Sequence, residues 1–322
     1  MDVPITETIR DNNGALYTKL DRIFRSPTET SVPVSYSIEI AAKDDFKVGE
    51  LERLTPQPIF CALPWISDDN LRYADDFRRA PTLELSDQLS TAQYTVVNHV
   101  SCYNITEQQV DGLLSSGIRN LFVIRGDTVQ EEQTFQHSAA LVRYLRKQQE
   151  ERVLPKLTIG VGGYPYGHHQ SPSKLEELRY LKEKIDQGVD FLLTQTLYDA
   201  ESFFRYREQC RTAGISIPII PGIYVPYSYR HLRAMLNLTR ITLLPAMDAA
   251  FAAHANDDPA QFEAFVVEHF VGVLRELLEP NVTSSDPIHS TSNASAAFHL
   301  AAFFVTPTPV AWRPLALTSM VN

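Results

Sequence analysis

Short runs of apolar, often β-branched residues alternate along the chain with longer segments whose apolar residues recur at helical spacing. Most runs are apolar on both faces, as in strands of a sheet buried on both sides. The runs predicted as strands are 34–40, 59–63, 94–99, 120–124, 157–161, 190–194 and 217–221. The segments predicted as helices are 86–92, 106–116, 131–151, 173–187, 200–213, 229–236 and 259–279. Such alternation predicts an α/β fold with a parallel sheet.

Helix ends have recognisable signals in this pattern. Thr106 with Glu107 indicates one helix start, and Ser173 followed by Glu176 has the spacing of a capping box. Three glycines follow helical segments where a left-handed cap would lie, namely Gly117, Gly188 and Gly214.

Seven strands leave a parallel barrel one strand short of closure, so we expect an eighth strand after the helix at 259–279. The one strand-like run beyond that helix is 297–305, in a segment rich in Ser, Thr, Pro and Ala. The chain of 322 residues suits one barrel with appendages. We predict an α/β protein with a TIM-type (β/α)8 barrel over 31–305, an N-terminal arm or helix outside the barrel over 1–30, and a divergent C-terminal tail over 306–322.

The charge balance narrows the classes of partner. The formal net charge is -10, which repels phosphate backbones and anionic membrane surfaces, so we expect neither nucleic acid nor membrane as a partner. No apolar run reaches the length of a membrane span, and the first residues do not resemble a secretion signal. Three widely spaced cysteines offer no disulfide framework or CxxC site. We expect a cytoplasmic protein, and a homo-oligomer is compatible with this composition.

Polar residues lie where the predicted strands end, which in a parallel barrel is the rim that holds reactive groups. Glu39, His99 and Gln195 follow three of the strands, and the segments 125–127 and 162–164 read RGD and GGY. A purely structural barrel does not need a carboxylate, an imidazole and an amide at one rim, so we expect a cofactor-dependent enzyme. The glycines would let a flat or phosphorylated ligand approach the backbone closely.

Six blocks occur in an order that resembles the methylenetetrahydrofolate reductase family. They read SIEIAA, NHVSCYNIT, NLFVIRGD, IGVGGYPYGHHQS, DFLLTQTLYDAESFFRY and IPIIPGIY, and the resemblance extends from about Ser35 to Leu278. It implies a flavin-dependent reductase in which FAD takes hydride from NAD(P)H and passes it to 5,10-methylenetetrahydrofolate, in a ping-pong cycle that forms 5-methyltetrahydrofolate.

The resemblance also implies roles for particular residues. Glu39 corresponds to the general acid that protonates the departing folate nitrogen, and an apolar setting would raise its pKa. Asp127 corresponds to a catalytic carboxylate near flavin and folate. Gln195 and Tyr229 correspond to residues that bind the substrate rings. The alternatives are a solvated strand-end Glu39, capping roles for Asp127 and Gln195, and core packing for Tyr229.

Further positions match the cofactor-binding residues of the family. They are Trp65, His99, Arg125, Gly126, Asp127, Ser138, Tyr164, His168 and Lys184. Lys184 would pair with the FAD pyrophosphate, and its alternative is a solvated helix face. His168 and His169 have no further ligand at metal-binding spacing, so we expect no metal.

The chain also departs from the family pattern. Residues 40–43 read IAAK where the family usually has FFPP, Pro64 replaces a threonine, and the eighth-strand motif HFYTLNR is not recognisable. The alternative function is therefore a catalytically impaired FAD- or folate-binding barrel that acts as a binding or interaction protein. A third hypothesis, a metal-dependent barrel hydrolase or aldolase, predicts activity that chelators remove.

Overall fold

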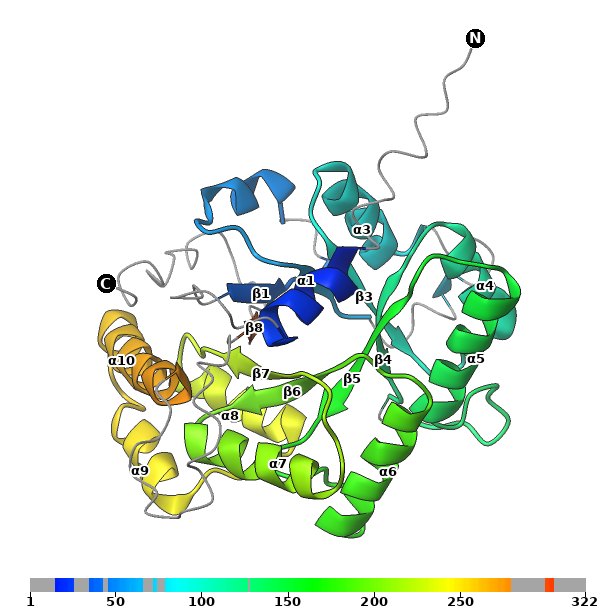
Figure 1. The fold of residues 1–322 in the computed structure, drawn as a ribbon. Coiled ribbons are helices and arrows are strands. Elements are labelled where there is room, and N and C mark those ends of the chain that lie inside the picture. Colours follow the sequence, from blue (N-terminus) through cyan, green and yellow to red (C-terminus); the bar gives the residue numbers. More distant parts are fainter. Residues whose placement is uncertain are drawn as a thin grey trace.

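The protein forms a closed parallel barrel of eight strands, which confirms the predicted fold class (Figure 1). The computed structural model describes residues 15–25, 35–42, 46–65, 72–73, 79–126, 128–278 and 299–303. Each strand pairs with its neighbours in chain order, and the last pairs with the first. The strands are β1 (Ser35–Glu39), β2 (Cys61–Leu63), β3 (Val96–Ser101), β4 (Asn120–Ile124), β5 (Thr158–Gly163), β6 (Phe191–Leu197), β7 (Ile219–Tyr224) and β8 (His299–Phe303).

Several strands extend further toward their carboxyl ends than the apolar runs predict. The difference is largest at β6 and β7, where pairing continues through Thr196↔Gly222 and Leu197↔Ile223 after a register shift that follows Leu193. Gln195, Thr196 and Gly222 interrupt the apolar runs there while the backbone pairing continues, so hydropathy alone misses the extension. Gln195 consequently lies inside β6 rather than after it.

The strand-like run at 297–305 contains β8, which closes the barrel. β8 pairs in parallel with β7 on one side and with β1 on the other. In this register Phe303 is the partner of both Glu39 and Tyr224. The carboxyl ends of β1 and β7 therefore lie at one level, two strand spacings apart. The predicted boundaries at residues 30 and 305 fall outside the described residues.

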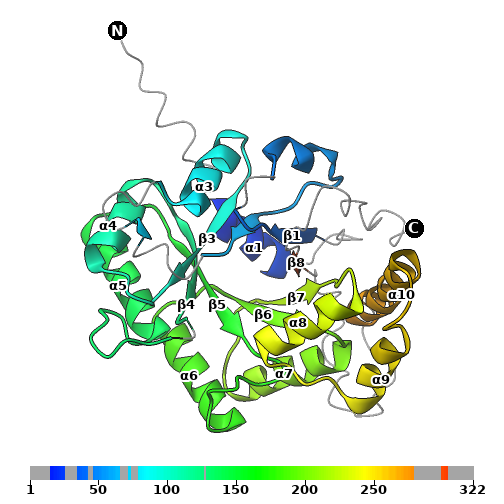
Figure 2. The ribbon, with the colours of Figure 1, turned by 180° about the vertical axis from the view of Figure 1, so that it is seen from behind.

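Helices surround the barrel in both views (Figures 1 and 2). A 3-10 helix, η1, spans Val48–Arg53. The α-helices of the described segments are α1 (Ala15–Arg25), α3 (Pro81–Thr91), α4 (Glu107–Ser115), α5 (Ser138–Glu151), α6 (Lys174–Asp186), α7 (Ala200–Thr212), α8 (Tyr229–Thr239), α9 (Pro245–Ala253) and α10 (Pro259–Leu278). The sequence pattern did not predict η1 or α9.

The predicted helix at 131–151 is wrong over its first turns, because α5 begins only at Ser138. The preceding segment is a loop that glutamine side chains hold in place. Gln133 donates to the Phe135 carbonyl at 2.7 Å, and Gln136 donates to the carbonyls of Gln130, Glu131 and Gln133. These bonds satisfy backbone acceptors that a helix would otherwise engage.

The predicted capping signals differ in how far the structure bears them out. Thr106 and Gln109 form a complete capping box at α4. The Ser173 hydroxyl accepts from the Glu176 N–H, which is one half of the box expected at α6. Gly117, Gly188 and Gly214 all have positive φ after helix ends, as predicted.

α1 lies over the centre of the barrel in both views (Figures 1 and 2). Leu16 and Leu20 are buried in one cluster with the barrel-lining residues Phe60, Phe122 and Phe191. At the same end, Lys19 donates to Thr95 at 2.9 Å, and Lys156 lies over the Tyr17 ring at 4.8 Å. Thr95 and Lys156 precede β3 and β5, so α1 covers the amino ends of the strands. The expected N-terminal helix exists, and it closes the barrel opposite the predicted site.

Two larger hydrophobic clusters fill the layer between strands and helices. None of the helices in the described segments combines the length and apolarity that a membrane crossing requires.

Candidate functional site

Glu39 and His99 lie together at the rim formed by the carboxyl ends of the strands. Glu39 is the last residue of β1, and His99 is within β3. Glu39 Oε2 lies 3.6 Å from His99 Nε2, and the two side chains are 15% and 8% exposed. The His99 ring packs on Phe122 with 4.7 Å between ring centroids. The structure therefore brings together two residues that are far apart in the sequence.

Burial decides the charge state of this pair. It raises the pKa of Glu39 to about 8 and lowers the pKa of His99 to about 3. Both side chains are therefore uncharged at neutral pH, the carboxyl with its proton and the imidazole without a second one. His99 Nε2 has no hydrogen-bond partner among the described residues. The rim thus holds a protonated acid beside a buried polar atom that is available to a ligand.

A second group of predicted residues forms a cationic corner, which we define as Arg125, His168 and Lys184. Burial lowers the pKa of Lys184, and the nearby Arg125 lowers it further. The pKa of His168 is lowered by burial first, then by His169, Arg125 and Lys184. These effects show that Arg125, after β4, and Lys184, of α6, lie near one another and near the uncharged imidazole of His168, in the loop after β5.

Among the described residues, no acidic group forms an ion pair with Arg125 or Lys184, although Glu177 and Glu183 raise the pKa of Lys184. Glu177 accepts from Lys174 at 2.6 Å and from the His168 N–H at 2.7 Å, so its carboxylate is already engaged. Arg125 donates to the Gln170 side chain, a neutral partner. The Lys184 side chain forms no hydrogen bond or ion pair with another described residue. The corner is thus suited to an anionic ligand such as a pyrophosphate.

The structure shows why three positions of the rim are glycine, which the sequence did not reveal. A Cβ on Gly163 would lie 2.7 Å from the Tyr206 hydroxyl, and one on Gly162 would lie 3.3 Å from the Tyr164 hydroxyl. The space beside these two glycines is therefore filled by tyrosine rings of the protein, not left open for ligand approach as expected. Gly126 has φ +86°, and a Cβ there would lie 2.9 Å from Ser101 Oγ.

Tyr164 and Gln195 are both near the rim with defined contacts. The Tyr164 ring meets the His168 ring edge-on at 4.5 Å. Gln195 Nε2 donates to the carbonyl of Thr239, at the end of α8, over 3.3 Å. Gln195 is therefore tied to α8 in this structure.

Other predicted residues lie in packed surroundings. Trp65 is 7% exposed and belongs to the cluster that contains Leu83 and Cys102. Ser138 is buried at the start of α5. Tyr229 is half-buried and packs against the cluster that contains Leu232 and Leu236, which is the core-packing alternative. Asp127 lies outside the described residues.

Sequence reasoning missed the residues that support the site. Phe122 provides the surface for the His99 ring, and Glu177 fixes the loop that contains His168 through its bond to the His168 N–H. Phe122 lies in an ordinary apolar run, where the alternation of inward positions along β4 is the one signal for it. Glu177 lies in an ordinary charged helix, and the sequence offered no signal for it.

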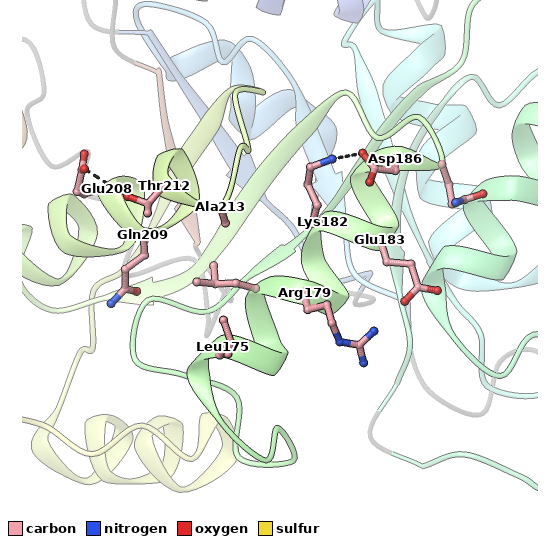
Figure 3. A pocket seen from close by; sticks show the side chains of 11 residues that line it. Leu175, Arg179, Lys182, Glu183, Asp186, Glu208, Gln209, Thr212 and Ala213 are labelled. Atoms are coloured by element: carbon pink, nitrogen blue, oxygen red, sulfur yellow. Dashed lines mark hydrogen bonds and ion pairs between the residues drawn. The ribbon is translucent and has the colours of Figure 1, made fainter.

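A groove on the outer surface, between α6 and α7, is separate from these residues (Figure 3). Leu175, Arg179, Lys182 and Glu208 contribute to its lining, and none of the predicted site residues does. Within the described segments, no three His, Cys, Asp or Glu side chains are grouped to hold a metal ion.

The fold and the rim define a (β/α)8-barrel protein with a buried acid and a cationic corner suited to an anionic ligand. The family model described as methylenetetrahydrofolate reductase matches residues 53–291. The chain belongs to the methylenetetrahydrofolate reductase family. The match begins after β1, so it does not include Glu39.

Curated relatives are similar in sequence to parts of this chain. Methylenetetrahydrofolate reductase 1 of Schizosaccharomyces pombe is 36% identical over 135 residues, which cover 39% of this chain and 22% of the relative. Methylenetetrahydrofolate reductase (NADH) 1 of Arabidopsis thaliana is 27% identical over 248 residues, covering 70% and 40%. The probable NADPH enzyme of Caenorhabditis elegans is 30% identical, covering 58% and 29%. The matched segments thus span less than half of these relatives.

A solved structure has a similar fold. An uncharacterized protein from Clostridium thermocellum, described as binding two copies of 5-methyl-5,6,7,8-tetrahydrofolic acid, superposes with a TM-score of 0.53 at 10% identity. The superposition covers 89% of this chain and 94% of that one.

Proposed function

We propose that this protein reduces 5,10-methylenetetrahydrofolate to 5-methyltetrahydrofolate with NAD(P)H through bound FAD, in a ping-pong cycle. The observation that supports it best is the buried, protonated Glu39 beside a neutral His99. Family membership makes the folate the expected substrate. The relatives include enzymes named for NADH and for NADPH, so either nicotinamide suits the proposal.

The cationic corner fits the cofactor that the family implies. Among the described residues Lys184 and Arg125 form no ion pair, although Glu177 and Glu183 raise the pKa of Lys184, and a dinucleotide pyrophosphate would add negative charge beside both cations. Gly126, with its positive φ beside Arg125, lets the backbone turn at this point. We expect Arg125, His168 and Lys184 to hold the phosphates, and His99 and Tyr164 to contact the ring system. When bound, FAD accepts hydride from NAD(P)H and delivers it to the folate methylene carbon.

Glu39 would act on the folate before the hydride arrives. In 5,10-methylenetetrahydrofolate the methylene carbon bridges N5 and N10, and it accepts hydride only after the bond to N10 breaks. The bonding electrons go to N10, which takes the proton of Glu39, and the carbon remains on N5 as an iminium. Hydride then converts this group to the methyl of the product, and Glu39 regains a proton from water. The neutral His99 leaves this proton on Glu39, because it adds no positive charge that would stabilise the carboxylate.

Asp127, Gln195 and the exposed part of the half-buried Tyr229 complete the proposal as the groups that contact the folate. Gln195 would exchange its bond to the Thr239 carbonyl for one to the pterin or the nicotinamide. Ser138 and Trp65 would act as buried supports of the cofactor region, since both are packed.

The purified chain tests the function directly. We expect a yellow protein with an FAD spectrum that oxidises NADH or NADPH with menadione, and that transfers reducing equivalents to 5,10-methylenetetrahydrofolate. A protein that binds 5-methyltetrahydrofolate or FAD but has no folate turnover would support the alternative, a binding protein that has lost catalysis. Activity that depends on a metal and is lost with chelator would contradict both.

A further inference from the structure

The loop that joins β5 to α6 carries several of the proposed cofactor contacts. We call residues 164–170 the β5–α6 loop. Tyr164 and His168 belong to it, with their rings edge-on at 4.5 Å, and the side chain of its Gln170 accepts a hydrogen bond from Arg125. The position of this loop therefore decides where part of the cationic corner presents its charges.

Two side chains of α6 hold the loop from its own helix. Glu177 accepts from the His168 N–H at 2.7 Å, and Lys174 donates to the Tyr164 carbonyl at 2.7 Å. Lys174 and Glu177 also bond to each other at 2.6 Å. Both belong to the helix that the loop leads into. They therefore fix the loop relative to α6, and its position against the next strand depends on other contacts.

Tyr166, a residue of the loop that the sequence did not single out, joins it to the next strand and helix. Its hydroxyl donates to Asp199 Oδ2 at 2.7 Å and accepts from the Tyr198 N–H at 2.9 Å. Both partners lie directly after β6, the strand that contains Gln195. The β5–α6 loop is thus held from two sides, by α6 and by the end of β6.

Asp199 is itself fixed in place. It is the N-cap of α7, where Oδ1 accepts from the Ser202 N–H at 2.6 Å and Oδ2 from the Ser202 hydroxyl at 3.0 Å. Burial raises the pKa of Tyr166, and Asp199 raises it further, so the phenol keeps its proton and donates. The Tyr166 ring lies 6.4 Å from the Tyr198 ring and packs against the buried cluster around it. A carboxylate acceptor in a fixed position makes a strong hydrogen bond.

We propose that Tyr166 is a positioning residue, whose bond to Asp199 keeps the β5–α6 loop in the arrangement that binds the cofactor pyrophosphate. This proposal rests on the proposed function and deepens it. Without the bond, the ligand-free loop would populate other arrangements, and the observed affinity would fall with the fraction that remains competent to bind. The effect would be on cofactor affinity and not on the chemical steps, because Tyr166 acts through the loop.

Tyr166→Phe tests the proposal, because it keeps the ring and removes the hydroxyl. The matched control is Tyr144→Phe, since the Tyr144 hydroxyl donates to Asp111 at 3.1 Å and joins α5 to α4, away from the loop. We expect Tyr166→Phe to raise the Kd for FAD about 10-fold and Tyr144→Phe to leave it within about twofold. With FAD in excess, the rate of flavin reduction by NAD(P)H should be unchanged in both. Equal Kd values in the two variants, or slower reduction of the bound flavin in Tyr166→Phe, would overturn the proposal.

Substitutions of the acceptor provide a second comparison. Asparagine can cap α7 and can still hydrogen-bond the Tyr166 oxygen through its amide group, so Asp199→Asn should bind FAD within about threefold of the unsubstituted protein. Asp199→Ala removes the bond and should weaken FAD binding at least as much as Tyr166→Phe does. Adding Tyr166→Phe to Asp199→Ala should then cost little more, because the bond is already lost. Losses that multiply in the double variant would contradict the proposed coupling.

Hydrogen exchange in the ligand-free protein separates this proposal from the proposed function. The His168 N–H, which Glu177 accepts, should exchange about fivefold faster or more in Tyr166→Phe and at an unchanged rate in Tyr144→Phe. Unchanged exchange in Tyr166→Phe would overturn the positioning role even if the protein binds FAD. An unsubstituted protein that binds no FAD would refute the proposed function, and the exchange rates would still show whether Tyr166 holds the loop.

Discussion

At the scale of single residues, burial changes the chemistry of Glu39 more than any neighbouring charge does. A carboxyl group at the end of a strand normally loses its proton near pH 4.5, and here the pKa is raised to about 8. His99 is affected in the opposite sense, since its pKa falls to about 3. Both shifts have the same cause, which is the cost of placing a charge in a poorly hydrated site.

Glu39→Gln should remove folate reduction, by at least about 100-fold, because the amide cannot protonate N10. Flavin reduction by NAD(P)H should stay within about twofold, since that step does not use the acid. In the unsubstituted protein, folate reduction should decline as pH rises through about 8, where Glu39 loses its proton. Stopped-flow measurement of each half-reaction against pH tests this, and equal losses in both half-reactions would exclude the assigned role.

The same substitution has a stability effect with a definite sign. Between pH 4.5 and about 8 the folded protein binds a proton at Glu39 that the unfolded chain has released, so stability falls as pH rises. Glutamine has no such proton. The melting temperature of Glu39→Gln should therefore exceed that of the unsubstituted protein by more at pH 8 than at pH 5, and a difference that is independent of pH would contradict the shifted pKa.

Lys184→Met should weaken FAD binding by about 10- to 100-fold, because it removes a cation proposed to pair with the pyrophosphate. Lys182→Met is the matched control on the same helix, since Lys182 pairs with Asp186 at the surface. Fluorescence titration with FAD measures both. Without FAD, Lys184→Met should melt at the same or a higher temperature, because burial disfavours the Lys184 cation and no ion pair among the described residues offsets that cost. Equal affinity losses in the two variants would argue for a nonspecific charge effect.

At the scale of elements, the sequence predicted what local patterns determine. Strands β1 to β7 and most helices followed from hydrophobic period, and the ends at Gly117 and Gly188 followed from glycine chemistry. The start of α5 did not, because glutamine side chains bind the carbonyls of the preceding loop and the hydrophobic period cannot show this. The Glu39 and His99 positions were foreseen at the rim, while their 3.6 Å separation depends on barrel closure.

Local sequence patterns could not predict the position of α1 either, because its apolar face contacts residues of β2, β4 and β6 that are distant in sequence. Leu16→Ala should lower the free energy of unfolding by about 2 to 4 kcal/mol, since Leu16 is fully buried at the amino end of the barrel. Thr18→Ala on the exposed side of α1 should change it by less than about 0.5 kcal/mol. Urea unfolding measures both, and similar values for the two would contradict the packing of α1.

At the scale of the whole molecule, one short strand decides whether the barrel is closed. β8 is joined to β7 and to β1 by parallel ladders, and the long α9–α10 segment precedes it in the chain. Closure sets the spacing between Glu39 and the end of β7.

Ala301→Pro should destabilise the protein by about 3 kcal/mol or more, because proline removes a backbone donor from a strand paired on both sides. Ala301→Gly keeps that donor and should cost about 1 kcal/mol. Urea unfolding with 5-methyltetrahydrofolate binding as a second readout tests the difference. A proline variant as stable as the glycine variant would show that β8 does not close the barrel in solution.

Because α1 covers the amino ends of the strands, the described residues leave the carboxyl-end rim as the side from which molecules can reach Glu39. In the proposed ping-pong cycle, both reactants would use this one opening in turn, and an excess of either would obstruct the other. Raising the folate concentration should therefore eventually slow the proposed reaction, and added nicotinamide nucleotide should relieve that slowing. A helix distant from the proposed reaction would in this way determine how the reactants enter and leave the barrel.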